Sequence, residues 1–391
     1  MSFDPFDFET QKDPYPAYEW LRNESPVYYV EKHDLWVLSR YEDVQSTIRD
    51  WETYSNREGV DIDKTDSLLS PGNMDEKDGR EHDVYRRLLQ PWFSPKVFQR
   101  RLLEPVRAEV ARLVGDLVAQ GSGDVTEMIA WQLPTFVVAQ MFDVPEERRP
   151  EMLSFMKPVF ARVPNDPNPP QAAFVAGEHI EAFCREIIVQ RRQEDPEGRD
   201  DIISHLMRSE LEGSSLSDEQ ILGMIAHLIV ASSGTTQDLI TNAIWLLADH
   251  PGERAKLIED RSKISAAIEE CLRYESVVQS VSRVSNVVTQ HHGTNIPAGA
   301  TIVNLLGSAN RDERYWEDPK RFDISRKPGR HLAFADGIHH CIGAPVARLE
   351  TRLVLEELLT QMPEYELAVP PVRAISHVAR GFEHVEIRSG A

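Results

Sequence analysis

The feature that most constrains the fold is a long, almost unbroken series of amphipathic helix patterns between residues 80 and 275. Apolar residues recur there at the three- and four-residue spacing of a helix that buries one face. A further helix pattern covers 344–361, and alternating strand patterns are confined to 24–40, 277–305 and 364–391. The sequence therefore predicts a mainly α protein with a minor antiparallel β part, folded as one domain over all 391 residues.

Charge and cysteine usage exclude several classes of partner. The chain has 43 Lys and Arg against 64 Asp and Glu, a net charge of −21, whereas phosphate binding needs clustered cations. The N-terminal segment is acidic and interrupted by proline, and the apolar pattern at 221–247 carries too many polar residues for a membrane span. Three widely separated cysteines form no CxxC pair. We therefore expect no nucleic-acid partner, no membrane partner and a cytoplasmic location.

A lone cysteine marks the most informative stretch, HLAFADGIHHCIGAPVARLE (331–350). Cys341 lies between Gly337 and Gly343, directly before a helix pattern. Glycine lets the backbone approach a bulky partner, and amides at a helix N-terminus stabilise a thiolate. The residues alone leave two interpretations, a thiolate that binds a metal and, more frequently for a single cysteine, an inert thiol buried in a turn.

This stretch resembles the haem-binding loop of the cytochrome P-450 family, Phe-x-x-Gly-x-His/Arg-x-Cys-x-Gly. Ala335 stands where glycine is more usual in the family. The resemblance implies a triangular helical prism with haem b (iron protoporphyrin IX) between a long distal helix and the helix after the cysteine loop. It also implies that Cys341 is the axial ligand of the haem iron. The matching residues are Phe334, Gly337, His339, Cys341 and Gly343.

Two further groups of charged residues match the same family. Glu270 and Arg273 share a helix face as a Glu-x-x-Arg pair, which in isolation is usually a solvated surface pair. The resemblance makes them a buried structural pair that Arg321, in DPKRFDISR (318–326), completes. The resemblance also implies a cationic clamp for the two haem propionates, because Arg and His suit carboxylates. Its predicted members are His82, Arg86, Arg283 and His339, with His331 as a weaker candidate.

The segment HLIVASSGTTQDLITN (227–242) resembles the oxygen-activation helix of the family, Ala/Gly-Gly-x-Asp/Glu-Thr-Thr. Thr235 would assist oxygen activation. Gly234, however, stands where the family has an acid that relays protons, and Ser232 stands where glycine is usual. Proton delivery would then be general acid catalysis by other groups. The remaining candidates for this relay are Ser232, Ser233, Thr235, Asp238 and ordered water.

The resemblance places a substrate pocket between the distal face of the haem and four segments, 57–78, 154–180, 227–235 and 277–281. An apolar lining predicts a small or medium apolar organic substrate such as a terpenoid or an aromatic ether. His227 could bond a substrate oxygen, although a core histidine bonded to backbone is the somewhat more frequent arrangement. The predicted lining consists of His227, Val230, Ala231, Val277, Val278, Val281 and Phe382.

The activity implied by the resemblance is that of a haem-thiolate monooxygenase. It would insert one oxygen atom from O2 by hydroxylation or oxidative O-dealkylation, with electrons from NAD(P)H through a reductase and a ferredoxin or flavodoxin. Because Gly234 replaces the acid, a peroxide-driven or NADH-dependent reductive enzyme is one alternative, and a non-catalytic haem sensor is another. The electron donor would dock on the thiolate side, on a patch that could equally be a solvated helix face: Arg86, Arg87, Lys96, Arg100, Arg101, Arg348 and Arg352.

Overall fold

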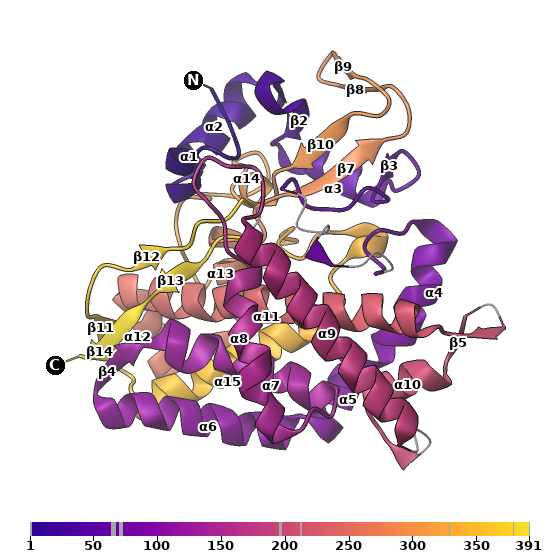
Figure 1. The fold of residues 1–391 in the computed structure, drawn as a ribbon. Helices are drawn as coiled ribbons and strands as arrows, with labels where there is room; N and C mark the ends of the chain where they lie inside the picture. Colours follow the sequence, from indigo (N-terminus) through magenta and orange to yellow (C-terminus); the bar gives the residue numbers. More distant parts are fainter. Residues whose placement is uncertain are drawn as a thin grey trace.

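The structure is a computed structural model in which helices fill most of the volume and the main sheet lies at one end (Figure 1). Part of the predicted 57–78 loop, residues 64–67 and 70–72, lies outside the described residues. The described residues are 2–63, 68–69, 73–194, 198–211, 213–327, 329–377 and 379–390.

Helices dominate between residues 79 and 274, as the periodicity predicts. Within the predicted helical range, the pattern over 95–120 is divided at Leu102, because Pro105 in the first turn of the second helix has no N–H to continue the first. The helices of this part are α4 (Gly79–Leu89), α5 (Pro95–Arg101), α6 (Leu103–Gln120), α7 (Gln132–Met141), α8 (Arg149–Val159), α9 (Gln171–Gln193), α10 (Ile202–Arg208), α11 (Asp218–Asp249), α12 (Pro251–Glu259) and α13 (Ile264–Tyr274).

The long helix α11 runs through the middle of the helical part (Figure 1). Ser217 and Gln220 form a reciprocal capping box at its start, which satisfies N–H groups that have no partner within the helix. Most of its residues are buried on every side, because helices α7, α9, α13 and α15 (Ala344–Gln361) pack around it. Among the helices of the described ranges, none is long and apolar enough to cross a membrane.

The main sheet has five strands in the order β1-β2-β10-β7-β3. Its pairs are antiparallel, as predicted, except that β10 runs parallel to β2. A parallel neighbour requires a long crossover, and here most of the chain separates the two strands. These strands are β1 (Val27–Val30), β2 (Leu35–Leu38), β3 (Tyr54–Ser55), β7 (Val281–Ser285) and β10 (Thr301–Asn304).

Short strands and helices complete the fold. The C-terminal strand β14 pairs on one side with β11 and on the other with β4, which lies inside the region predicted to be helical. Small two-stranded pairs are β5 with β6, β8 with β9 and β12 with β13. The bounds are α1 (Phe8–Lys12), α2 (Tyr15–Glu24), α3 (Tyr41–Arg49), α14 (Leu306–Ala309), β4 (Ser122–Asp124), β5 (Glu210–Leu211), β6 (Ser214–Ser215), β8 (Thr289–His291), β9 (Thr294–Ile296), β11 (Tyr365–Leu367), β12 (Val372–Arg373), β13 (Phe382–His384) and β14 (Glu386–Ser389).

Candidate functional site

The loop before α15 holds Cys341 at the wall of a cavity. Ala335 and Gly337 adopt left-handed φ values of 55° and 73°, which turn the chain back on itself. Gly337 also lies against α3, where a Cβ atom would come within 3.0 Å of Arg49 Cα. The Cys341 N–H then donates to the Phe334 carbonyl at 3.0 Å, so the loop closes and its thiol opens onto the cavity.

The thiol lies at the N-terminus of α15. Burial raises the pKa of Cys341, while the backbone N–H groups of Gly343 and Ala344 act in the opposite direction. Those N–H groups and the positive end of the helix stabilise a thiolate, which is the form that binds a metal. The position of Cys341 therefore suits a metal-bound sulfur better than an inert thiol.

The cavity has a volume of about 320 Å³ and lies between the cysteine loop and α11. Its lining is mostly apolar. On the α11 side the apolar Leu228, Val230, Ala231 and Leu239 lie among polar side chains, and the segment that leads into β7 contributes valines. Most of the predicted pocket residues belong to this lining. The predicted residues that line the cavity are His227, Val230, Ala231, Ser232, Thr235, Val277, Val278, Val281, Phe334, Cys341 and Gly343.

Cationic side chains gather at one end of the same cavity. The His82 and His339 rings lie 4.4 Å apart, and Arg86 and Arg283 line the cavity nearby. Burial lowers the pKa of Arg283 to about 10 and that of His339 to about 4. Nε2 of His82 and Nδ1 of His339 are buried, with no hydrogen-bond partner within the described ranges. Buried polar atoms of this kind require a partner, and an anionic ligand would provide one.

Among the predicted residues that lie outside this cavity are Phe382 and His331. The ring of Phe382 packs instead against Trp245 and Arg373, with ring centroids 5.1 Å apart in the first contact. The strand β13 directs the Phe382 side chain toward α11. In this part of the chain Ala379, rather than Phe382, lines the cavity. His331 is also absent from the lining, because its Nε2 lies 3.0 Å from a carboxylate oxygen of Glu269. The interpretation of Phe382 as a pocket residue is therefore wrong, and His331 belongs to an ion pair.

The four relay candidates on α11, and Gly234 among them in sequence, fall on different faces of the helix. Thr235 and Ser232 face the cavity, and Thr235 Oγ1 donates to the Ala231 carbonyl at 2.7 Å. Ser233 Oγ donates to a backbone carbonyl on the buried side of the helix. Gly234 abuts an aromatic ring, and Asp238 lies close to Gly381 rather than at the cavity. Of these residues, only Thr235 and Ser232 are therefore placed to contact a group bound in the cavity.

Asp75 is a cavity residue that the sequence did not single out. Its Oδ2 lies 2.9 Å from Nε2 of His227, and both residues line the cavity. Burial alone would raise the pKa of Asp75, but His227 outweighs it, and the pKa is lowered. Several acidic residues are spaced through 58–76, so no sequence signal distinguishes Asp75. The imidazole of His227 therefore faces the cavity while it is paired with the carboxylate of Asp75.

The Glu-x-x-Arg pair is buried, but Arg321 does not complete it. Arg273 donates two hydrogen bonds to Glu270, at 2.7 and 2.8 Å. The second guanidinium on this carboxylate belongs to Arg326, whose Nε lies 3.1 and 3.2 Å from the two oxygens. The side chain of Arg321 is 62% exposed, and only its backbone carbonyl joins the network. The segment 318–326 contains both arginines, and the backbone turn decides which one points inward.

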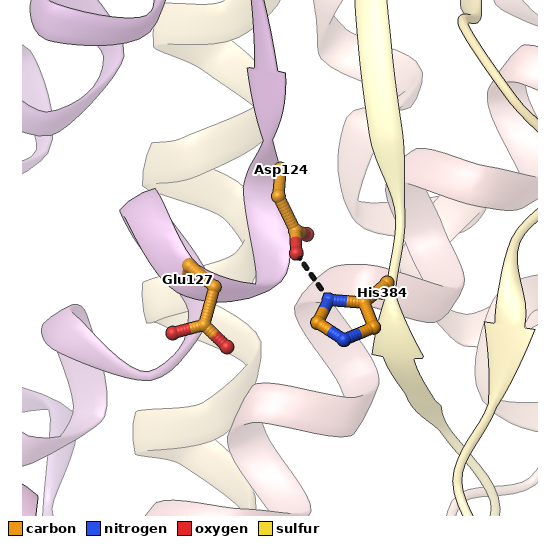
Figure 2. Close-up of side chains that lie close together, drawn as sticks. All are labelled: Asp124, Glu127 and His384. Carbon is orange, nitrogen blue, oxygen red and sulfur yellow. Dashed lines mark hydrogen bonds and ion pairs between the residues drawn. The ribbon is translucent and has the colours of Figure 1, made fainter.

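A separate cluster of Asp124, Glu127 and His384 lies at the surface beside β4 (Figure 2). His384 Nδ1 lies 2.7 Å from Asp124, which also accepts two backbone N–H bonds, and Glu127 forms an ion pair with Lys157. These contacts account for all three side chains as a junction between β4, β13 and the π-helical turn at 126–130.

A mainly helical fold with a lone cysteine at a cavity wall and basic side chains beside it is typical of a haem-thiolate protein. A sequence model of the family "Cytochrome P-450" matches residues 6–376, and the chain belongs to that family. Cytochrome P-450 monooxygenase PikC of Streptomyces venezuelae is 34% identical over 96% of this chain and 91% of its own length. The chain also resembles CYP109Q5 from Chondromyces apiculatus, with 30% identity, a TM-score of 0.88 and coverage of 100% and 98% of the two chains. CYP109E1 from Bacillus megaterium, solved in complex with testosterone, has 28% identity, a TM-score of 0.84 and coverage of 97% and 100%.

Members of this family are oxidoreductases that bind haem and act on organic substrates with O2. The described residues fit that cofactor. The thiol faces the cavity, Phe334 and Gly343 line it beside the thiol, and the orphaned histidine nitrogens lie where anionic groups could bind them. The haem would supply the oxygen chemistry, and the chain would supply the ligand, the groups that hold the carboxylates and the shape of the remaining space.

Proposed function

We propose that this chain is a monooxygenase that adds one oxygen atom from O2 to a small or medium apolar organic substrate, with electrons delivered by a ferredoxin or flavodoxin. The observation that carries the proposal is a cavity with a mostly apolar lining and Cys341 at its wall. An apolar wall excludes water and favours an apolar ligand. The testosterone complex of CYP109E1 supports the size range.

The residues of the clamp would hold the cofactor through its two carboxylates. His82, Arg86, Arg283 and His339 combine buried cations with free ring nitrogens, which suits charge-assisted hydrogen bonds. Cys341 would be the axial ligand of the iron. Burial lowers the pKa of Arg283 and His339, and an anionic partner would raise it again; Arg283 is charged at neutral pH in either case, whereas His339 would gain its charge only with such a partner.

Thr235 is the proposed proton-handling residue. Its hydroxyl donates to the Ala231 carbonyl, so the lone pairs of Oγ1 remain available to a water molecule in the cavity. The hydroxyl of Ser232 lies on the same side of α11 and could hold a second water. A chain of these hydroxyls and waters would replace the acid that Gly234 does not provide.

The proposed docking face for the electron donor is a groove on the thiolate side. Phe93, Phe98 and Leu349 give it an apolar floor, and Arg348 and Arg352 stand at its edge. Arg87, Lys96 and Arg100 are exposed on the neighbouring helices α4 and α5. An apolar floor with a basic rim suits a small acidic protein such as a ferredoxin.

A spectral titration of the purified holoenzyme tests the proposal. We expect one class among aromatic ethers, terpenes, fatty acids and steroids to shift the ferric spectrum from low to high spin, and the product to contain one oxygen atom from O2. Cys341→Ala should abolish the red-shifted band of the reduced carbon monoxide complex. Persistence of that band, or turnover with hydrogen peroxide but with no electron-donor system, would contradict the proposal.

A further inference from the structure

Gly234 lies in the middle of α11 at a point where no side chain fits. A Cβ atom built there would lie 2.5, 2.6 and 2.9 Å from three carbons at the tip of the Phe160 ring. Separations below 3.0 Å essentially never occur for real Cβ atoms, so any side chain at position 234 would have to displace this ring. The Phe160 ring therefore occupies the space that the Cβ atom of a side chain at position 234 would need.

Phe160 connects this point to the cavity. It caps the C-terminus of α8, and its ring lies 6.1 Å from that of Trp131. Phe160 lines the same cavity as Ala231 and Thr235, which flank Gly234 on α11. The ring thus has α11 on one side, Trp131 on another and the cavity beside it.

A glycine inside a helix is otherwise unfavourable. It costs about 1 kcal/mol relative to alanine, so its presence in a buried, well-packed helix calls for a packing reason. Gly115 in the interior of α6 offers a contrast, because a Cβ atom there would meet nothing within 4 Å in the part of the chain that is described. The close approach at Gly234 is therefore not a general property of helical glycines, although Gly177 on α9 is also closely approached, there by the backbone of Leu68.

We propose that the absence of a side chain at Gly234 makes room for the ring of Phe160. The position of this ring against α11 then sets the width of the substrate cavity beside Thr235. Without a side chain at 234, the ring lies against α11 and leaves room for a bulky ligand. A side chain at 234 displaces the ring, and displacement into the adjacent cavity narrows that cavity and selects for small ligands. The inference rests on the proposed use of this cavity as the substrate site.

The test compares the binding affinities of a small and a bulky ligand for holoenzyme variants in which the Phe160 ring is displaced or removed. Imidazole serves as the small iron ligand and clotrimazole as the bulky apolar one, and both are followed by spectral titration. We expect Gly234→Ala to weaken clotrimazole binding about tenfold or more, the range that a lost methylene-sized space produces, and to leave imidazole binding within about twofold. Gly234→Ala/Phe160→Ala should recover most of the clotrimazole affinity.

Gly115→Ala is the matched control for helix propensity, and it should change neither affinity. Equal weakening of both ligands by Gly234→Ala, no weakening of either, or no recovery in the double variant would overturn the proposal. Should Gly234→Ala fail to fold, Gly234→Ala/Phe160→Ala must fold and bind both ligands if the ring is the obstacle. Azole binding does not require turnover. The binding test can therefore be interpreted even if the proposed oxygenation activity is not found.

Discussion

Burial alone can set the charge of a single residue, and Asp238 is the clearest case in this chain. The carboxyl group lies against the Gly381 backbone, where a Cβ atom would overlap it. Burial raises the pKa of Asp238 to about 8, and the positive charge of Arg373 only partly opposes this. The residue is therefore protonated at neutral pH, although aspartate in an unfolded chain titrates near pH 4.

We expect the free energy of unfolding to fall as the pH rises from about 4 to about 8, because the folded form keeps a proton that the unfolded form releases. Asp238→Asn has no proton to release at this position. Between pH 5 and pH 8 its free energy of unfolding should therefore fall less than that of the wild type, by on the order of 2 kcal/mol. Denaturant unfolding of both proteins at the two pH values measures the effect. The exposed Asp116→Asn serves as control, and equal slopes in wild type and Asp238→Asn would contradict the expectation.

The sequence located single residues best where a chemical motif fixed their spacing, although Val277, Val278 and Val281, outside any motif, also line the cavity. Phe334, Cys341 and Gly343 line the cavity as predicted, because a short loop leaves the side chains little choice of position. Phe382 was assigned to the wrong surface, since a lone aromatic residue in a short strand gives no sign of which face it occupies. Asp75 was missed because its partner lies about 150 positions away along the chain.

At the scale of elements, the carboxylate of Glu270 connects α13 to the segment before the cysteine loop. It accepts hydrogen bonds from Arg273, Arg326 and the backbone N–H of Asp323. Arg326 also donates to the carbonyls of Asp318 and Arg321, so it holds the turn of its own segment as well. Removal of Arg326 therefore affects both α13 and the segment that leads to the haem loop.

We expect Arg326→Ala to lower the free energy of unfolding by about 2 to 3 kcal/mol, because the buried Glu270 carboxylate loses one of its charged donors and the turn loses its hydrogen bonds to Asp318 and Arg321. The loss stays below that of a broken isolated pair, since Arg273 still neutralises Glu270. Arg321→Ala is the matched control, and its exposed side chain predicts a change within about 0.5 kcal/mol. Equal effects of the two substitutions on chemical denaturation would refute this assignment of the inner arginine.

Helices were predicted better than strands for a physical reason. A helix such as α15 is encoded by its own periodic residues, and its bounds agree with the predicted 344–361. The strand β4 has only three residues and exists because β14, from the other end of the chain, pairs with it. No local pattern within 122–124 contains that information.

At the scale of the whole molecule, Glu275 joins parts of the chain that are far apart in sequence. Its carboxylate binds Arg373 and Arg380 at 2.8 and 2.6 Å and Arg311 at 3.4 Å. The hydroxyl of Tyr15 donates to it at 3.0 Å. The N-terminal segment, the end of α13, the turn after α14 and the C-terminal strands thus meet at one buried charge, close to where the main sheet meets the helical part.

Removing that charge should weaken the entire fold. Burial opposes ionisation of Glu275, but Arg380, Arg373 and Arg311 outweigh it and lower the pKa of Glu275 to about 2. Its contribution to stability is therefore complete above pH 4 to 5, where the unfolded chain also ionises, and is lost as the pH falls toward 2. Glu275→Gln keeps the size of the side chain and leaves three arginines without their carboxylate. We expect a loss of about 3 to 5 kcal/mol at pH 7.

The pH dependence separates this charge effect from a packing effect. The stability difference between wild type and Glu275→Gln should narrow by about 1.5 kcal/mol between pH 6 and pH 3, because the wild-type carboxylate loses its advantage as protons compete for it. Glu178→Gln, at an exposed position on α9, should show no such change. Denaturant unfolding of the three proteins across this range provides the measurement. A difference that stays constant with pH would mean that Glu275 acts through its shape and hydrogen bonds, and that the termini are held together without its charge.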